Sequence, residues 1–119
     1  MIPKIGTKGQ IAEKLALNFL EKRGLKLVQQ NFHCRFGEID IIMQDQQTLV
    51  FVEVKFRQST DYGHPLESIT ADKLTKLKKT ASYYLMKNKL DAVACRFDVL
   101  GLSGDLSTPT INWIKNALD

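Results

Sequence analysis

The sequence has few of the residues that mark small secreted or metal-stabilised domains. Its 119 residues include 2 cysteines, 3 prolines and 1 tryptophan. Cys34 and Cys95 are far apart and follow no zinc-binding spacing, so neither a disulfide framework nor a structural zinc site is expected. We predict that both thiols are free and buried, as is usual for cysteines in a reducing compartment.

Long apolar runs are also missing from the sequence. No uninterrupted apolar stretch approaches the roughly 20 residues that a membrane-spanning helix needs. Residues 1–6 lack the apolar segment of a secretory signal. We therefore expect a cytoplasmic protein without membrane contacts.

The composition itself is that of an ordinary globular protein. Apolar residues make up 44% of the chain and charged residues 25%, which argues against disorder. A chain of this length can bury about two-thirds of its surface, enough for a core without disulfides. Because the sequence has no repeat, low-complexity tract or linker, we predict a single domain over residues 1–119.

Positive charge is concentrated in one segment of the chain. The formal net charge is +4, yet outside residues 73–89 the chain carries 11 basic and 13 acidic side chains. Residues 73–89 contain no acidic residue and six lysines, Lys73, Lys76, Lys78, Lys79, Lys87 and Lys89. Such a segment is expected for contact with a phosphate backbone, although a solvated helix face has the same composition.

Periodicity predicts two helices and five strands. A helix is expected over 8–23, stopped by Gly24, and another over 71–87, after the N-cap candidate Thr70. The predicted strands are 26–33, 38–43, 49–56, 94–102 and 110–114. Their order, α-β-β-β-α-β-β, indicates an α/β domain in which helices flank a mixed β-sheet.

Charged residues interrupt two of the predicted strands. Glu53 and Lys55 lie on one face of segment 49–56, which is apolar on both faces and is therefore expected at the centre of the sheet. A hairpin turning at residues 45–47 would bring Asp40 opposite residue 52 or 53. An ion pair between Glu53 and Lys55 is one explanation of these charges, and a functional site is the other.

Two carboxylates held close together repel each other, and a hard divalent cation removes that repulsion. Oxygen ligands without histidine or cysteine favour Mg²⁺ or Mn²⁺ over zinc. Glu13 lies at the edge of the apolar arc of its helix, in line with Leu17 and Leu20. It is either a third carboxylate of this site or an ordinary boundary residue.

These residues occur in strings that resemble a known family. Asp40 followed by Glu53-Val54-Lys55 resembles the core of the PD-(D/E)xK nucleases, and Glu13 on the preceding helix is similar to the arrangement in Holliday junction resolvases. More closely, the chain resembles the bacterial YraN-like family in Lys73 and in the strings GQIAEKLA (9–16), GEID (37–40), VFVEVKFR (50–57) and RFDV (96–99).

The resemblance implies a restriction-endonuclease-like fold and a metal-dependent endonuclease that hydrolyses phosphodiester bonds in DNA, with branched or damaged DNA among the candidate substrates. It implies that Asp40, Glu53 and the Val54 carbonyl bind Mg²⁺ or Mn²⁺, with Glu13 as a further ligand, directly or through water. Glu13, Asp40, Glu53 and Lys55 would form the catalytic set, in which Lys55 orients the attacking water and stabilises charge on the phosphate.

Nucleic-acid contacts are expected at Lys73, Lys76 and Lys79 of the basic segment, and at Arg57, which lies on the same strand face as Lys55. The alternative is a nucleic-acid-binding or assembly module that keeps the fold without turnover. A homodimer is a further expectation, since resolvases of similar fold make paired cuts.

Overall fold

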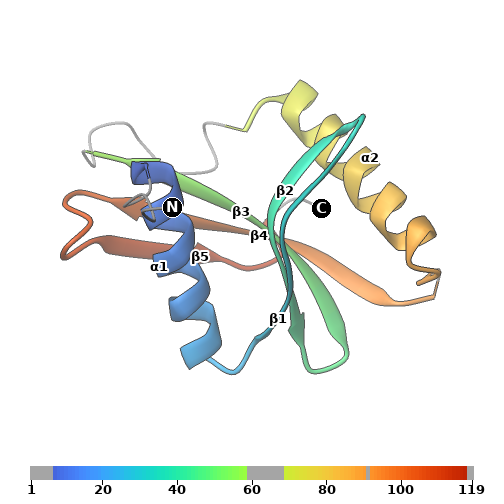
Figure 1. The fold of residues 1–119 in the computed structure, drawn as a ribbon, viewed down its shortest axis with the longest axis horizontal. Coiled ribbons are helices and arrows are strands. Elements are labelled where there is room, and N and C mark those ends of the chain that lie inside the picture. The colour runs from blue at the N-terminus through green and yellow to red at the C-terminus, as the bar shows by residue number, and fades with distance from the viewer. Residues whose placement is uncertain (1–6, 59–68, 91, 118–119) are drawn as a thin grey trace, which may run out of the picture.

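A computed structural model describes residues 7–58, 69–90 and 92–117 of the chain. The elements follow the predicted order (Figure 1), with every end within two residues of its predicted position. They are α1 (Lys8–Lys22), β1 (Lys26–Cys34), β2 (Gly37–Asp45), β3 (Thr48–Arg57), α2 (Ala71–Lys87), β4 (Ala94–Ser103) and β5 (Thr110–Ile114). The predicted α/β class is therefore confirmed.

The strands form one mixed sheet in the order β1-β2-β3-β4-β5. Neighbouring strands are antiparallel except β3 and β4, which are parallel and are connected through the α2 segment, as a parallel pair requires. The apolar strand β3 is central, as predicted. In the predicted β2–β3 hairpin, Ile41 lies opposite Val52 and Asp45 opposite Thr48.

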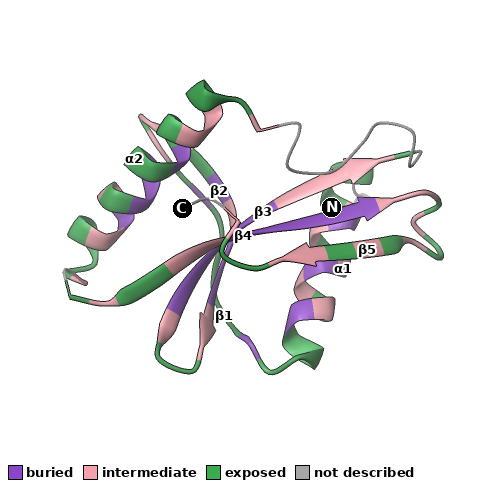
Figure 2. Cartoon of the chain, turned by 180° about the vertical axis from the view of Figure 1, so that it is seen from behind, coloured by how far each residue is buried: buried purple, intermediate pink, exposed green. Residues whose placement is uncertain are grey.

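The two helices cover opposite faces of the sheet. Ala12, Ala16 and Leu20 of α1 pack on one face, in a core completed by Leu25, Ile41, Met43, Val50, Val52, Leu100 and Leu102. Leu77, Ala81 and Tyr84 of α2 pack on the other, with Phe32, Ile39, Ile42, Leu49 and Phe51. Buried residues accordingly concentrate along the sheet and on the inner sides of both helices (Figure 2).

Local sequence fixes the ends of the helices. Thr7 begins α1 with a capping box, in which its hydroxyl accepts from the Gln10 N–H at 3.2 Å and the Gln10 side chain accepts from the Thr7 N–H at 2.9 Å. Gly24, at a φ of 94°, follows its last turn. The predicted N-cap Thr70 accepts from the Lys73 N–H at 3.1 Å.

The sheet divides between β2 and β3. Their ladder ends at the pair Ile41 and Val52, whereas β3 stays paired with β4 as far as Arg57. Residues 37–40 of β2 pair only with β1, and this hairpin bends toward α2 (Figure 1). Gly37 packs closely there, because a Cβ at its position would lie 3.1 Å from Thr80 Oγ1. The division leaves an opening in the middle of the sheet.

A buried aspartate on β4, Asp98, links several strands of the sheet. Asp98, whose side chain is 0% exposed, accepts from Arg96 Nε (3.0 Å), Trp113 Nε1 (3.0 Å) and the Asn116 N–H (2.9 Å). The Arg96 guanidinium also donates to Asp45 at 3.0 Å. This network connects β4 to the β2–β3 hairpin and to β5.

The cysteines differ from the prediction. Both are free, but Cys34 is only half-buried and Cys95 is exposed. Cys95 lies at the start of β4, where the first two residues of the strand are exposed and only the later ones are buried. Among the described residues, no helix is both long and apolar enough to cross a membrane.

Candidate active site

The opening between β2 and β3 is a cleft of about 340 Å³. Because the sheet is divided here, α1 on one face and α2 on the other both reach the same cleft. Its lining includes seven residues predicted for the site: Glu13 from α1, Asp40 from β2, Glu53, Val54, Lys55 and Arg57 from β3, and Lys73 from α2. The structure thus brings these seven residues together.

Asp40 lies just beyond the last β2–β3 pair. Its Oδ2 accepts from the Val54 N–H at 2.9 Å, so the carboxylate replaces the backbone acceptor that a continued ladder would have supplied. The N–H and C=O of one strand residue point to the same side. The Val54 carbonyl therefore faces the same opening as Asp40.

Glu53 is a buried carboxylate with incomplete compensation. Its side chain is 6% exposed, and the Lys73 ammonium lies 2.9 Å from Oε2. That contact lacks hydrogen-bond geometry, and Oε2 accepts no hydrogen bond from any described residue. The charge partner of Glu53 is thus Lys73 on α2, and not Lys55 as the ion-pair alternative required.

Two carboxyl groups of the cleft, those of Asp40 and Glu13, have pKa values above their ordinary ones. Burial, with the close contact and charge of Glu53, raises the pKa of Asp40 to about 8, although the Val54 N–H acts in the opposite direction. Burial also raises the pKa of Glu13, helped by the charges of Glu38 and Glu53. Burial alone would lower the pKa of Lys73, but Glu53, Asp40 and Glu38 raise it above its ordinary value. The cleft lining thus combines three carboxyl groups with three basic side chains.

These features fit a hard cation. Asp40, Glu53 and the Val54 carbonyl offer three oxygen ligands at one place, and Glu53 Oε2 is a buried oxygen without a hydrogen bond. Over residues 7–58, 69–90 and 92–117, no three His, Cys, Asp or Glu side chains are gathered closely enough to form a complete cage. Glu13, from α1, also lines the cleft.

The basic residues of β3 flank the carboxylates. Lys55 is half-buried and lines the cleft beside Glu53 and Val54. Arg57 lies at the end of the same strand, and its Nη1 donates to the Phe56 carbonyl at 3.3 Å. Both cations border the site from the strand that carries Glu53.

The predicted lysines of α2 do not all reach the cleft. Lys73 does, but Lys76 forms an exposed (i, i+4) ion pair with Asp72 at 3.2 Å. Lys79 lines a second pocket, which sequence analysis missed. Residues three apart on a helix drift around its axis, so this series leads away from the cleft. The string Arg35-Phe36-Gly37 between two strands signalled a turn with an aromatic residue, but not its position against α2.

Comparisons with known proteins agree on one family. The model of the uncharacterised protein family UPF0102 matches residues 12–102. A UPF0102 protein of Psychromonas ingrahamii is 48% identical over 111 residues, which cover 93% of this chain and 88% of that protein. A UPF0102 protein of Legionella pneumophila is 48% identical over 113 residues, 94% of each chain. One from Coxiella burnetii is 46% identical over 109 residues, 91% of this chain and 88% of that protein.

Proposed function

The chain belongs to the uncharacterised protein family UPF0102, the YraN-like family of the restriction-endonuclease-like superfamily, and on this premise we propose that it is a metal-dependent endonuclease acting on DNA. One observation carries the proposal. The half-buried Asp40 and the buried Glu53 lie together in a cleft, and apart from its ion pair with Lys73, Glu53 Oε2 has no hydrogen-bond partner among the described residues. An arrangement that is costly for stability is best explained by a ligand.

Asp40, Glu53 and the Val54 carbonyl would hold Mg²⁺ or Mn²⁺, with Glu13 completing the set directly or through water. The cation would supply positive charge at the phosphate and a bound water of lowered pKa. Asp40 would lose its proton as the cation binds, because carboxylates coordinate in the charged form.

Lys73 has a second role in this proposal. In the structure it partly compensates the charge of Glu53 across 2.9 Å. Once that charge is compensated by a divalent cation, the Lys73 ammonium is free to bind a phosphate oxygen of the substrate. Lys73 would therefore change partner between the free and the loaded protein.

Lys55 is the residue that acts on the reacting groups. From the strand position two residues after Glu53, its ammonium would orient the attacking water and stabilise the charge that develops on the phosphate. Arg57 would contact a neighbouring phosphate, and Lys76 and Lys79 phosphates farther along the strand.

A nuclease panel tests this function. The wild type is incubated with linear, nicked, single-stranded, flapped and four-way-junction DNA in Mg²⁺, Mn²⁺ or EDTA. Cleavage of at least one substrate is expected with metal and none with EDTA. Asp40→Asn, which keeps an acceptor for the Val54 N–H, should bind DNA and fail to cut. A wild type that cuts nothing, or an Asp40→Asn protein that cuts at the wild-type rate, would contradict the proposal.

Two observations favour a second candidate, a nucleic-acid-binding module without turnover. Within the described residues, no complete three-side-chain cage is present, and Lys73 already offsets part of the charge of Glu53. Such a module would bind DNA equally well in EDTA and in Mg²⁺, and no substrate of the panel would be cut.

A further inference from the structure

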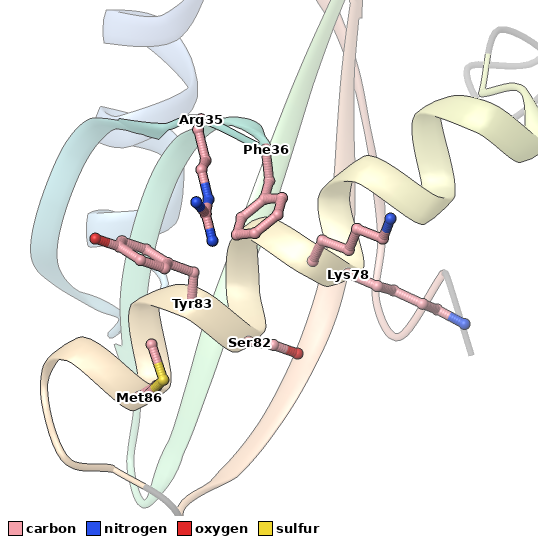
Figure 3. A pocket seen from close by; sticks show the side chains of 7 residues that line it. Arg35, Phe36, Lys78, Ser82, Tyr83 and Met86 are labelled. Atoms are coloured by element: carbon pink, nitrogen blue, oxygen red, sulfur yellow. The ribbon is translucent and has the colours of Figure 1, made fainter.

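A second pocket, of about 490 Å³, lies between the β1–β2 turn and the outer side of α2. Its lining is Arg35 and Phe36 from the turn and Lys78, Lys79, Ser82, Tyr83 and Met86 from the helix. Figure 3 shows the Arg35 and Phe36 side chains pointing from the turn toward Tyr83. All these residues lie outside the cleft.

The walls of this pocket are aromatic and held in place. The Phe36 and Tyr83 rings are 6.1 Å apart and inclined by 62°, and Tyr83 is backed by the Phe32 ring at 6.4 Å and 30°. Met86, 64% exposed, adds a flexible apolar side. Flat, rigid apolar surfaces of this kind are stacking platforms for a nucleobase.

The charges of the pocket have a single sign. Arg35, Lys78 and Lys79 are cationic, and the lining contains no acidic residue. The Arg35 guanidinium lies 4.8 Å from the centre of the Phe36 ring, beside the aromatic surface. A ligand that combines an apolar ring with negative charge complements this lining. A second copy of the chain would oppose its own cations to these.

Helix α2 contributes residues to both the pocket and the cleft. On α2, Lys73, Lys76 and Lys79 follow one another at three-residue intervals from the cleft to the pocket, about 9 Å along the helix axis. On β2, the path from Asp40 back to Phe36 is about 13 Å. A few nucleotides span such distances.

We propose that this pocket stacks an unpaired base of the nucleic acid whose backbone lies in the cleft. The proposal rests on the nuclease function proposed above and narrows its substrate to DNA with a single-stranded segment next to the bond that is cut. A base within a duplex cannot enter the pocket, because both of its faces are already stacked. Arg35, Lys78 and Lys79 would bind the flanking phosphates.

Equilibrium binding in EDTA tests the stacking without requiring cleavage. The probes are a blunt duplex and the same duplex with a 5′ or a 3′ overhang that carries 2-aminopurine at successive positions. The wild type should bind one overhang duplex about tenfold more tightly than the blunt one. The 2-aminopurine fluorescence should be quenched at one position of that overhang.

Variants of Tyr83 and Phe36 test whether the overhang preference and the quenching arise at this pocket. Tyr83→Leu and Phe36→Leu should reduce the preference for the overhang to less than twofold and abolish the quenching, while Tyr83→Phe keeps both. Circular dichroism and melting temperature establish that each variant is folded. Tyr83→Phe provides the matched comparison, because it retains the ring and loses only the hydroxyl.

Three results would overturn the inference: equal binding of blunt and overhang duplexes, unchanged preference in Tyr83→Leu, or displacement of the overhang duplex by a short acidic aromatic peptide at equal concentration. A wild-type dimer in sedimentation that Met86→Glu converts to a monomer would assign the pocket to self-association instead. Asp40→Asn should keep the overhang preference. Failure of the nuclease proposal alone would therefore leave these binding results intact.

Discussion

Asp98, on one side, and the pair of Asp40 and Glu53, on the other, are carboxyl groups in opposite environments. Asp98 accepts hydrogen bonds from Arg96, Trp113 and the Asn116 backbone, and it faces a guanidinium at 3.0 Å. Asp40 and Glu53 face each other, with one backbone donor on Asp40 and one lysine beside Glu53. Asp98 thus has donors from three residues for one carboxylate, whereas Asp40 and Glu53 together have one backbone donor and one ammonium.

The difference in hydrogen-bond partners separates a carboxylate that stabilises the fold, Asp98, from the pair proposed for function, Asp40 and Glu53. A buried charge that is fully hydrogen-bonded holds strands together, whereas the Asp40–Glu53 pair avoids two like charges at neutral pH because Asp40 keeps its proton. Burial alone would not distinguish the two groups. The number of hydrogen-bond donors and the sign of the neighbouring charges distinguish Asp98 from the pair of Asp40 and Glu53.

The largest effect is expected in the cleft that contains Asp40 and Glu53. Lys55→Ala should reduce the rate of cleavage by about 10²- to 10³-fold or more, because it removes a charge needed in the transition state. Binding of DNA, followed by fluorescence anisotropy, should change less than twofold. Lys14→Ala, on the exposed side of α1, is the control. A Lys55→Ala enzyme with the wild-type rate would rule out this role.

Asp98 should dominate stability instead. Asp98→Ala leaves Arg96 partly uncompensated and the Trp113 N–H without its acceptor, so denaturant unfolding should show a loss of about 3–5 kcal/mol. Asp40→Asn should cost little in the absence of metal, since Asp40 is uncharged at neutral pH and asparagine keeps an acceptor for the Val54 N–H. A loss below about 1 kcal/mol for Asp98→Ala would contradict the contrast.

Binding of a divalent cation to Asp40 and Glu53 should increase the stability of the folded protein. At 100 times the dissociation constant, Mn²⁺ or Mg²⁺ should stabilise the wild type by about 2.7 kcal/mol, seen as a higher melting temperature. Asp40→Asn should lose most of that gain, while Glu21→Gln, on the exposed side of α1, should keep it. An equal gain in all three proteins would place the metal elsewhere.

The proton on Asp40 sets the pH dependence of that binding. With a pKa of about 8 in the folded protein against 3.8 ordinarily, Asp40 is protonated at neutral pH and must release a proton to the solvent. The metal affinity should therefore rise about tenfold per pH unit up to pH 8 and then level off. Without metal, the raised pKa lowers stability as pH rises from about 4 to 8. Calorimetry at pH 6, 7, 8 and 9 measures the first effect, and a flat affinity would contradict it.

The smallest effect concerns the exposed pair of Lys76 and Asp72. Lys76→Ala should change stability by less than about 0.5 kcal/mol. If Lys76 binds a phosphate, the slope of log affinity against log salt should fall by about 0.9. An unchanged slope would remove Lys76 from the DNA contact, whatever its stability.

Most of the fold could be predicted from the sequence because its signals are local. Helical periodicity, the Thr70 cap and Gly24 depend on neighbouring residues, and the structure has them where expected. The approach of Asp40 to Glu53 could also be obtained, since a short turn fixes the register of the hairpin up to the adjacent pair Ile41 and Val52.

The parts that could not be predicted depend on distant segments. The ion pair of Lys73 with Glu53 joins α2 to β3, and no spacing along the chain encodes it. The division of the sheet follows from the β1–β2 hairpin bending toward α2, where Gly37 meets Thr80. Burial of Cys95 was predicted wrongly, because residue type does not reveal which end of a strand lies uncovered.

The division of the sheet also bears on aggregation. Beyond Val52, β3 presents an edge that no other described strand pairs with, next to the run Leu49–Val54, which is rich in β-forming residues. Charged side chains on such an edge prevent it from pairing with another chain. Glu53, Lys55 and Arg57 stand at alternate positions there. We therefore expect these charges also to disfavour the pairing of a foreign strand with the run Leu49–Val54.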